Sequence, residues 1–139
     1  MSDLERHTVA IPRPLFAAFD KRNKRKGYKN RSEAIRDLIR EALVEEEWAD
    51  PDARVAATAT IVYDHHTPAL TAKLTGVQHQ YGELIVSAMH VHLDHHTCLE
   101  VLVLRGKVRE VRKLADALAC IKGVKHAQLA LTAEGKTLH

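Results

Sequence analysis

The chain has 139 residues, of which 45% are hydrophobic, 28% charged and only 4% aromatic, and its formal net charge is +3. These values are ordinary for a folded soluble protein, and few aromatic residues favour small aliphatic cores that close by oligomerising. No apolar run approaches the ~20 residues of a membrane span and no export segment is evident, so we expect a cytoplasmic protein without a membrane partner. Two cysteines, Cys98 and Cys120, are too few for a disulfide framework.

The first element expected is a short strand over residues 6–11, in which side chains alternate between two faces. Its outward face carries Arg6, Thr8 and Ala10. A helix over residues 14–26 follows, and Gly27 ends it. The segment Asn30-Arg31-Ser32-Glu33 has the form of a capping box and begins a second helix with an apolar stripe.

Basic residues dominate this N-terminal third. Eleven Lys and Arg side chains lie between residues 6 and 40, against three Asp and Glu side chains. The imbalance favours a nucleic-acid partner, with a merely solvated charged face as the simpler alternative. One strand and two helices cannot bury a core alone, so we expect the strand to pair with its own copy in a second chain. The resulting two-stranded ribbon fits the major groove of DNA.

Contacts with double-stranded DNA follow from this ribbon. The side chains that would point at base edges are Arg6, Thr8 and Ala10. The start of the second helix would offer backbone N–H groups to a phosphate, at Asn30, Arg31 and Ser32. The sequence therefore predicts a DNA-reading arm in residues 1–48.

The second half of the chain has a different pattern. The break Asp50-Pro51-Asp52 indicates a linker at residues 49–53. The expected elements are strand 55–63, helix 68–80, strand 84–93, strand 98–104, helix 108–121 and strand 124–131. A βαββαβ order implies an antiparallel sheet with two helices on one face, so the predicted class is α+β.

A candidate metal site lies on two of these strands. His90-Val91-His92 places two imidazoles on one face, because alternate residues of a strand project together. Cys98 opens the antiparallel neighbour, so its thiolate returns close to His92. Two nitrogens and one sulfur suit Ni²⁺, Cu²⁺ or Zn²⁺ and not Mg²⁺ or Ca²⁺. A fourth ligand would decide between planar and tetrahedral geometry, and periodicity leaves that question open.

Other polar side chains in this half receive simpler interpretations. We expect Gln78 and Glu100 to orient the metal ligands through hydrogen bonds. Four histidines are expected in solvated loops, with extra metal binding as the alternative for the first pair: His65, His66, His95 and His96. Cys120, on the last helix, is expected to be a small buried hydrophobic residue.

Two stretches of the chain resemble a known family. Arg6-x-Thr8 followed by Gly-Tyr-Lys-Asn-Arg-Ser-Glu-Ala-Ile-Arg (residues 27–36) is similar to the ribbon-helix-helix fold, and His90-x-His92 with Cys98 matches the metal motif of the nickel-responsive regulators, NikR. The resemblance implies a ribbon-helix-helix domain at 1–48, an ACT-like, ferredoxin-type metal-binding and tetramerisation domain at 54–133, and a tail at 134–139. Ala10 departs from the family, in which a hydroxyl or amide commonly stands at this position.

The same resemblance implies further residues and partners. His79, eleven residues before His90, would be the fourth metal ligand and would come from a neighbouring subunit. The assembly would be a homotetramer, built as a dimer of dimers. Glu33 and Asp37 match positions that bind a second, oxygen-ligated cation such as K⁺.

Together these features predict a nickel-dependent, DNA-binding transcriptional repressor that controls nickel uptake genes. Its cofactor would be Ni²⁺ and its partner an operator in double-stranded DNA. Four protein ligands and no placed general base argue against an enzyme. The alternatives are a ribbon-helix-helix repressor that senses cobalt, copper, zinc or a small ligand, and a metal-storage protein.

Overall fold

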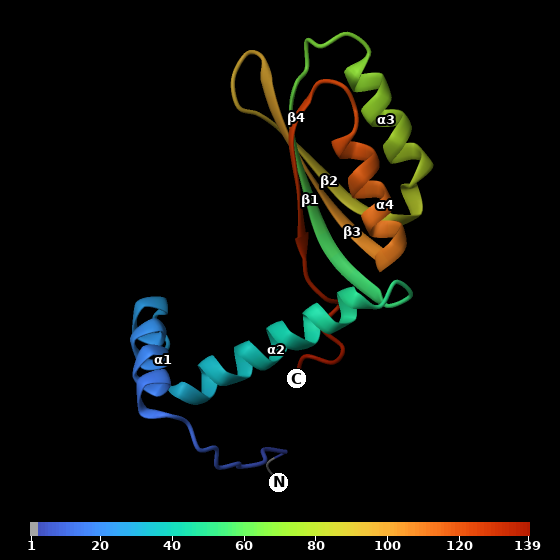
Figure 1. Ribbon diagram of the computed structural model, residues 1–139. Coiled ribbons are helices and arrows are strands. Elements are labelled where there is room, and N and C mark those ends of the chain that lie inside the picture. The colour runs from blue at the N-terminus through green and yellow to red at the C-terminus, as the bar shows by residue number, and fades with distance from the viewer. Residues whose placement is uncertain (1–2) are drawn as a thin grey trace. The chain divides into compact units, whose positions relative to one another are not determined.

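The computed structural model describes residues 3–139, and the chain divides into two compact units after Glu41. The helix α2 (Arg31–Ala49) crosses this boundary, so its last turns belong to the C-terminal unit. Figure 1 shows the order of the elements along the chain. Each helix within residues 3–139 is too short or too polar to cross a membrane.

The two helices of the N-terminal unit begin and end at local sequence signals. α1 (Arg13–Lys26) begins after Pro12 and ends where Gly27 has a φ of 85°, a left-handed conformation that glycine adopts without strain. α2 begins where the side-chain Oδ1 of Asn30 accepts the backbone N–H of Glu33 at 2.9 Å. Both helix boundaries predicted at this turn are confirmed.

Apolar side chains in this part of the chain remain exposed. The strand predicted over residues 6–11 is not formed in the described chain, where residues 3–12 have no regular secondary structure. The side chain of Val9 is 72% exposed. Four aliphatic residues along α2 are also exposed, by 38–54%: Ile35, Leu38, Ile39 and Leu43. The predicted ribbon concerns a pair of chains and stays a prediction.

The C-terminal unit is a four-stranded antiparallel sheet with two helices on one face (Figure 1). Its strand order is β2-β3-β1-β4. The elements are β1 (Arg54–Asp64), α3 (Leu70–Gln80), a 3₁₀ turn (Gly82–Leu84), β2 (Ile85–His92), β3 (Thr97–Lys107), α4 (Val108–Ala119) and β4 (Val124–Leu131). The predicted βαββαβ order and α+β class are confirmed, with small shifts at the ends of elements.

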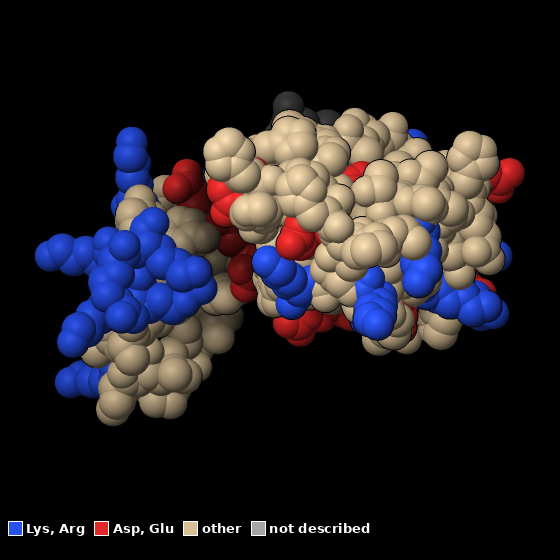
Figure 2. All heavy atoms as spheres, turned by 90° about the horizontal axis from the view of Figure 1, so that it is seen from above, with Lys and Arg blue, Asp and Glu red and all other residues tan. Residues whose placement is uncertain are grey.

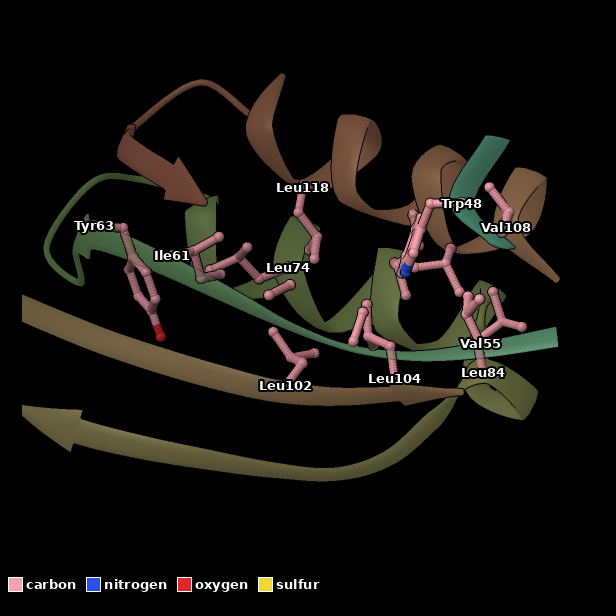
Figure 3. Packing of buried hydrophobic residues seen from close by; sticks show 14 of the residues in the cluster. Trp48, Val55, Ile61, Tyr63, Leu74, Leu84, Leu102, Leu104, Val108 and Leu118 are labelled. Atoms are coloured by element: carbon pink, nitrogen blue, oxygen red, sulfur yellow. The ribbon is translucent and has the colours of Figure 1, made fainter. Parts of the chain in front are cut away.

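The core of this unit lies between the sheet and its helices (Figure 3). Alternate residues of β1 from Val55 to Tyr63 are buried, because they share the face that the helices cover. Leucines of β3 and α4 complete the core: Leu102, Leu104, Leu114 and Leu118. Trp48, near the end of α2, packs on the same cluster, and its indole N–H donates to the carbonyl oxygen of Thr132 at 2.7 Å.

Cys120 is exposed, so the prediction of a buried side chain at this position is wrong. The buried stripe of α4 runs through Val111, Leu114 and Leu118, and the helix ends at Ala119. A side chain two positions beyond Leu118 lies about 200° around the helix axis from it. Cys120 therefore faces away from the core.

Candidate metal centre and nucleic-acid interface

Strand pairing brings three of the predicted metal ligands to one region of the sheet. In the antiparallel pair of β2 and β3, His90 lies opposite Glu100 and His92 lies opposite Cys98. The Nδ1 atom of His92 is 3.4 Å from the Sγ atom of Cys98, and the ring centroids of His90 and His92 are 5.0 Å apart. The structure thus brings these side chains together as strand alternation predicts, and their binding of a metal stays a prediction.

A further histidine, His65, belongs to the same group. Its Nδ1 atom is 3.2 Å from the Sγ atom of Cys98. Within residues 3–139, the ligating atoms of His65, His92 and Cys98 all lie within 4.8 Å of one another. The sequence predicts a solvated loop at His65, with extra metal binding as the alternative, and does not predict this contact. Tyr63 lies opposite Cys98 in the pairing of β1 with β3, so His65, two residues after Tyr63, comes close to the sulfur. The sequence could indicate this proximity only if β1 and β3 were already known to be neighbours.

Hydrogen bonds connect His90 to the interior. The hydroxyl of Tyr63 donates to Oε2 of Glu100 at 3.2 Å and lies 3.3 Å from Nε2 of His90. Gln78, on α3, donates to Oε1 of Glu100 at 2.9 Å. Because Tyr63 gives its proton to Glu100, we assign the Nε2 atom of His90 as the donor to the tyrosine oxygen, which leaves Nδ1 for a metal ion. The sequence pattern predicts Gln78 and Glu100 beside the site but does not predict Tyr63.

Burial changes the acidity of the groups around the sulfur. The side chain of Cys98 is buried, and this desolvation, followed by the carboxylates of Asp64 and Asp94, raises the pKa of its thiol. Desolvation, followed by the adjacent imidazole, lowers the pKa of His65. A transition metal binds the thiolate and the neutral imidazole, so metal binding at this group releases the thiol proton.

His79 lies apart from this group in the single chain. It is exposed near the end of α3 and lines a shallow hollow with Glu83 and Glu110. Within residues 3–139 it is not among the possible ligands that converge on Cys98. Its neighbour Gln78 faces the interior and contacts Glu100, so the helix directs the two adjacent side chains differently.

Lys and Arg side chains gather on the N-terminal unit (Figure 2). The last turn of α1 is entirely basic at Lys24, Arg25 and Lys26. A shallow hollow beside it is lined by Lys24, Lys29 and the first residues of α2, and also by Asp20, whose carboxylate binds Arg31. Lysine ammonium groups and the free backbone N–H groups of a helix start both attract anions, so this hollow has the chemistry of a phosphate site.

The side chains predicted to contact DNA differ in whether they already have hydrogen-bond partners within the chain. Arg6, Thr8 and Ala10 are exposed, as are Asn30 and Ser32. The guanidinium of Arg31 donates two hydrogen bonds to the carboxylate of Asp20, both at 2.8 Å, and stacks over the ring of Phe16 at 4.2 Å. A phosphate that used the Arg31 side chain would have to compete with Asp20.

The positions predicted for a second cation already have hydrogen-bond donors. The carboxylate of Asp37 accepts the hydroxyl proton of Tyr28 at 2.6 Å and a guanidinium N–H of Arg40 at 2.8 Å. These bonds, the one from Tyr28 first, lower the pKa of Asp37. Glu33 is exposed one helical turn earlier. A cation at this place would have to replace the Arg40 contact.

Comparison with known proteins identifies the family. Residues 56–132 match the NikR C-terminal nickel-binding domain, and residues 5–46 match the ribbon-helix-helix proteins of the CopG family. The chain belongs to the NikR family. Relatives named as nickel-responsive regulators include one from Geobacter sulfurreducens, 53% identical over the full length of both chains, and one from Solibacter usitatus, 53% identical over 97% of each.

Membership of the NikR family confirms the predicted succession of a ribbon-helix-helix domain and a metal-binding domain. It also assigns the chain to DNA-binding transcription regulators and not to enzymes. An uncharacterised protein from Thermotoga maritima has a solved structure that shares the fold, with a TM-score of 0.51 and 19% identity. That match covers 56% of this chain and 96% of the other, and it concerns the fold alone.

Proposed function

We propose that this NikR-family chain is a nickel-dependent repressor that acts in the cytoplasm on the operators of nickel uptake genes. One observation carries the proposal: a chain with a basic ribbon-helix-helix arm also brings imidazoles to a buried thiol, with His92 and Cys98 3.4 Å apart. The proposed domains are residues 1–48 for the arm, 49–53 for the linker, 54–133 for the metal domain and 134–139 for the tail.

The proposed nickel ligands are His79, His90, His92 and Cys98. Three imidazoles and one thiolate form a borderline-soft set, and a planar arrangement of such donors favours Ni²⁺ over Zn²⁺. The residues present fit this ion, because the buried thiol of Cys98 lies beside the imidazole of His92 and a hydrogen-bond network orients His90. A bound ion supplies directed bonds and positive charge that hold these side chains in one arrangement.

A homotetramer, built as a dimer of dimers, would supply His79 from a neighbouring subunit. His79 is exposed, so it is available to a second copy. The sheet face opposite the helices also carries exposed apolar side chains, with Met89 60%, Val91 38% and Val103 39% exposed. Exposed apolar surface of this kind is usual where subunits meet.

In the DNA complex the paired strands would present Arg6, Thr8 and Ala10 to base edges. The N-terminus of α2, at Asn30, Arg31 and Ser32, would hold a backbone phosphate. The basic hollow beside α2 supports this arrangement. Ala10 can contact a thymine methyl group but cannot donate a hydrogen bond from its side chain, so base readout at this position would be apolar.

The helix α3 would couple metal to DNA binding. It carries both Gln78, which contacts Glu100, and the proposed ligand His79. Ligation of His79 would fix α3 in one arrangement and favour the subunit spacing that fits two half-sites. Nickel shifts this equilibrium only if it binds the DNA-competent state more tightly than the other state.

A second, oxygen-ligated cation such as K⁺ would bind at Glu33 and Asp37. Both carboxylates lie on the first turns of α2, one helical turn apart. Such an ion would help to fix the arm once the Asp37–Arg40 ion pair opens.

Footprinting on promoter DNA of nickel uptake genes tests the function. The purified full chain, with one Ni²⁺ per subunit, should protect two half-sites, and chelation of the nickel should remove the protection. Transcripts of the same genes should rise when the regulator is deleted. Protection that is equal with and without nickel, or transcripts that fall on deletion, would contradict a nickel-dependent repressor.

A further inference from the structure

We infer that Asp20 limits the affinity of the arm for DNA of any sequence, because its carboxylate holds the guanidinium of Arg31 away from the phosphates. Arg31 would then contribute to DNA binding through its backbone N–H at the start of α2 and not through its charge. The inference rests on the proposed function only for the phosphate contact at the start of α2. It uses neither the proposed nickel ligands nor the proposed operators.

Paired hydrogen bonds between Asp20 and Arg31 join α1 to α2. The Nε and Nη2 atoms of Arg31 donate to the two carboxylate oxygens of Asp20, each at 2.8 Å. The same guanidinium lies 4.2 Å from the ring centroid of Phe16, which fixes its plane. Paired bonds from a guanidinium to a carboxylate are among the strongest that side chains form. One edge and one face of this guanidinium are therefore occupied within the chain.

The turn between the two helices holds both residues in this position. The backbone N–H groups of Gly27 and Tyr28 donate to carbonyl oxygens in the last turn of α1, at 3.2 and 3.0 Å. On the other side of the turn, the side chain of Asn30 caps α2. Because hydrogen bonds fix both ends of the turn, Asp20 and Arg31 are brought together before any DNA binds.

The ion pair changes the charge of the basic hollow beside α2. Three cationic side chains line this hollow: Lys24, Lys29 and Arg31. Among residues 3–139, neither lysine forms an ion pair, whereas Arg31 does. The bonds from Arg31 hold the pKa of Asp20 below its usual range, so this carboxylate is ionised at neutral pH. A paired guanidinium and carboxylate have no net charge, so phosphate attraction in the hollow comes from the two lysines and the N–H groups of α2.

Transfer of Arg31 from Asp20 to a phosphate is opposed by two effects. The guanidinium would lose both bonds to the carboxylate, and the carboxylate left behind in the hollow would repel the phosphate that arrives. The pair therefore stays closed when DNA binds. An arm with fewer phosphate contacts binds less tightly to the large excess of DNA that lacks its site, which leaves the base contacts of the paired strands to decide where it binds.

The salt dependence of binding to a duplex without operator half-sites tests this inference. The slope of log affinity against log salt counts phosphate contacts, so it separates a freed guanidinium from a change in helix packing. Fluorescence anisotropy measures the slope for the full chain, with one Ni²⁺ per subunit and with chelator. The variants are Asp20→Asn, Arg31→Gln and the double variant. The matched control is Glu41→Gln, which removes an exposed carboxylate of α2 that does not line the hollow.

Thermal unfolding shows whether each variant is folded. If Asp20→Asn does not fold, Asp20→Ser removes the same carboxylate with a smaller side chain and takes its place in the comparison.

In Asp20→Asn the slope should steepen by about 0.9 for each freed guanidinium that reaches a phosphate, so that a fourfold rise in salt costs an extra factor of about 3.5 in affinity per contact. Arg31→Gln, the double variant and Glu41→Gln should all keep the wild-type slope.

Three results would overturn the inference. They are a wild-type slope in Asp20→Asn, a shallower slope in Arg31→Gln alone, which would show that Arg31 already contacts a phosphate, and equal steepening in Glu41→Gln. Operator affinity that is equal with and without nickel would instead contradict the proposed function and leave these slopes unaffected.

Discussion

At the scale of single residues, the metal domain is organised around the buried carboxylate of Glu100, which is 8% exposed. Burying a carboxylate is costly unless hydrogen bonds compensate for its lost hydration. Gln78 and Tyr63 donate to its two oxygens at 2.9 and 3.2 Å. The same tyrosine contacts His90, so Glu100 connects a helix to a proposed metal ligand.

Replacing Tyr63 by Phe should weaken nickel binding by about 10–100-fold, as is usual when the hydrogen-bond partner of a metal ligand is lost. The cause is the lost hydroxyl, which fixes the tautomer and orientation of His90. Chelator competition measures the affinity. Tyr81→Phe, at the end of α3 and outside this network, is the matched control. Equal nickel affinity in the two variants would show that Tyr63 does not position the ligand.

Single-residue predictions from sequence succeed where strand alternation determines the geometry. His90, His92 and Cys98 converge because they share one face of an antiparallel pair. Tyr63 and His65 could not be predicted in this way, because their proximity to Cys98 depends on β1 and β3 being neighbours, a non-local pairing. Alternation within one strand carries no information about which strand lies beside it.

At the scale of elements, α2 is the segment through which the two units are joined. Its last turns pack on the core of the C-terminal unit through Trp48. The indole donates to the carbonyl oxygen of Thr132, and the guanidinium of Arg112 lies 5.2 Å from the ring centroid. The C-terminal segment contributes a further contact, from Thr137 to Glu47 at 3.1 Å. These contacts make the end of α2 an integral part of the metal domain.

Trp48→Ala should destabilise the protein by about 3–5 kcal/mol, the usual cost of truncating a large buried aromatic residue. Trp48→Phe keeps a ring in the core but loses the bond to Thr132, so its cost should be about 1–2 kcal/mol. Urea unfolding of the metal-free protein at one fixed concentration measures both, because assembly makes stability depend on concentration. Equal destabilisation by the two substitutions would show that the ring does not stabilise the core.

Local sequence signals predict where a helix begins or ends better than they predict whether a side chain at its end is buried. Gly27 and Asn30 define the turn between α1 and α2, as their backbone preferences predict. Cys120 was assigned wrongly because it lies about 200° around the axis from Leu118, off the buried stripe of α4, and α4 ends at Ala119, two residues before the predicted end. The end of a helix depends on packing that periodicity does not describe.

At the scale of the whole molecule, apolar surface remains exposed on both units. The aliphatic stripe of α2 includes Ile39, which is 54% exposed, and the open sheet face includes Met89, which is 60% exposed. Scattered exposure is ordinary in a monomer, but stripes along one element mark sites of association. The sequence of one chain predicts that these apolar surfaces exist. It does not predict which surface of a second copy covers each of them.

Ile39→Asp should abolish operator binding, because a charge on the stripe opposes the pairing of arms that forms the ribbon. Nickel binding per chain should persist, since the substitution lies outside the metal domain. Ile39→Leu keeps the stripe apolar and should bind DNA as wild type does. Fluorescence anisotropy with labelled operator measures DNA binding, and competition with a chelator measures nickel binding per chain. Normal operator affinity in Ile39→Asp would show that the aliphatic stripe of α2 is not part of the dimer interface.

Mixing two inactive variants tests the origin of His79. His79→Ala and Cys98→Ala each lack one ligand of every proposed nickel site. If His79 comes from a neighbouring subunit, mixed tetramers contain some complete sites, and the thiolate-to-nickel charge-transfer absorption should partly return after subunit exchange. Absence of any return, in a mixture shown by mass spectrometry to have exchanged, would place His79 and Cys98 of one site on the same chain.

The central claim is that nickel bound through His90, His92 and Cys98 governs DNA binding by the basic arm. Its most direct test is the operator affinity of the full chain, measured by anisotropy with one equivalent of Ni²⁺ per subunit and with chelator at constant salt, since salt alone changes such affinities strongly. We predict a gain of about tenfold or more with nickel, within the usual range of allosteric coupling, and no gain in His90→Ala. Equal affinity with and without nickel, or an undiminished gain in His90→Ala, would contradict the account.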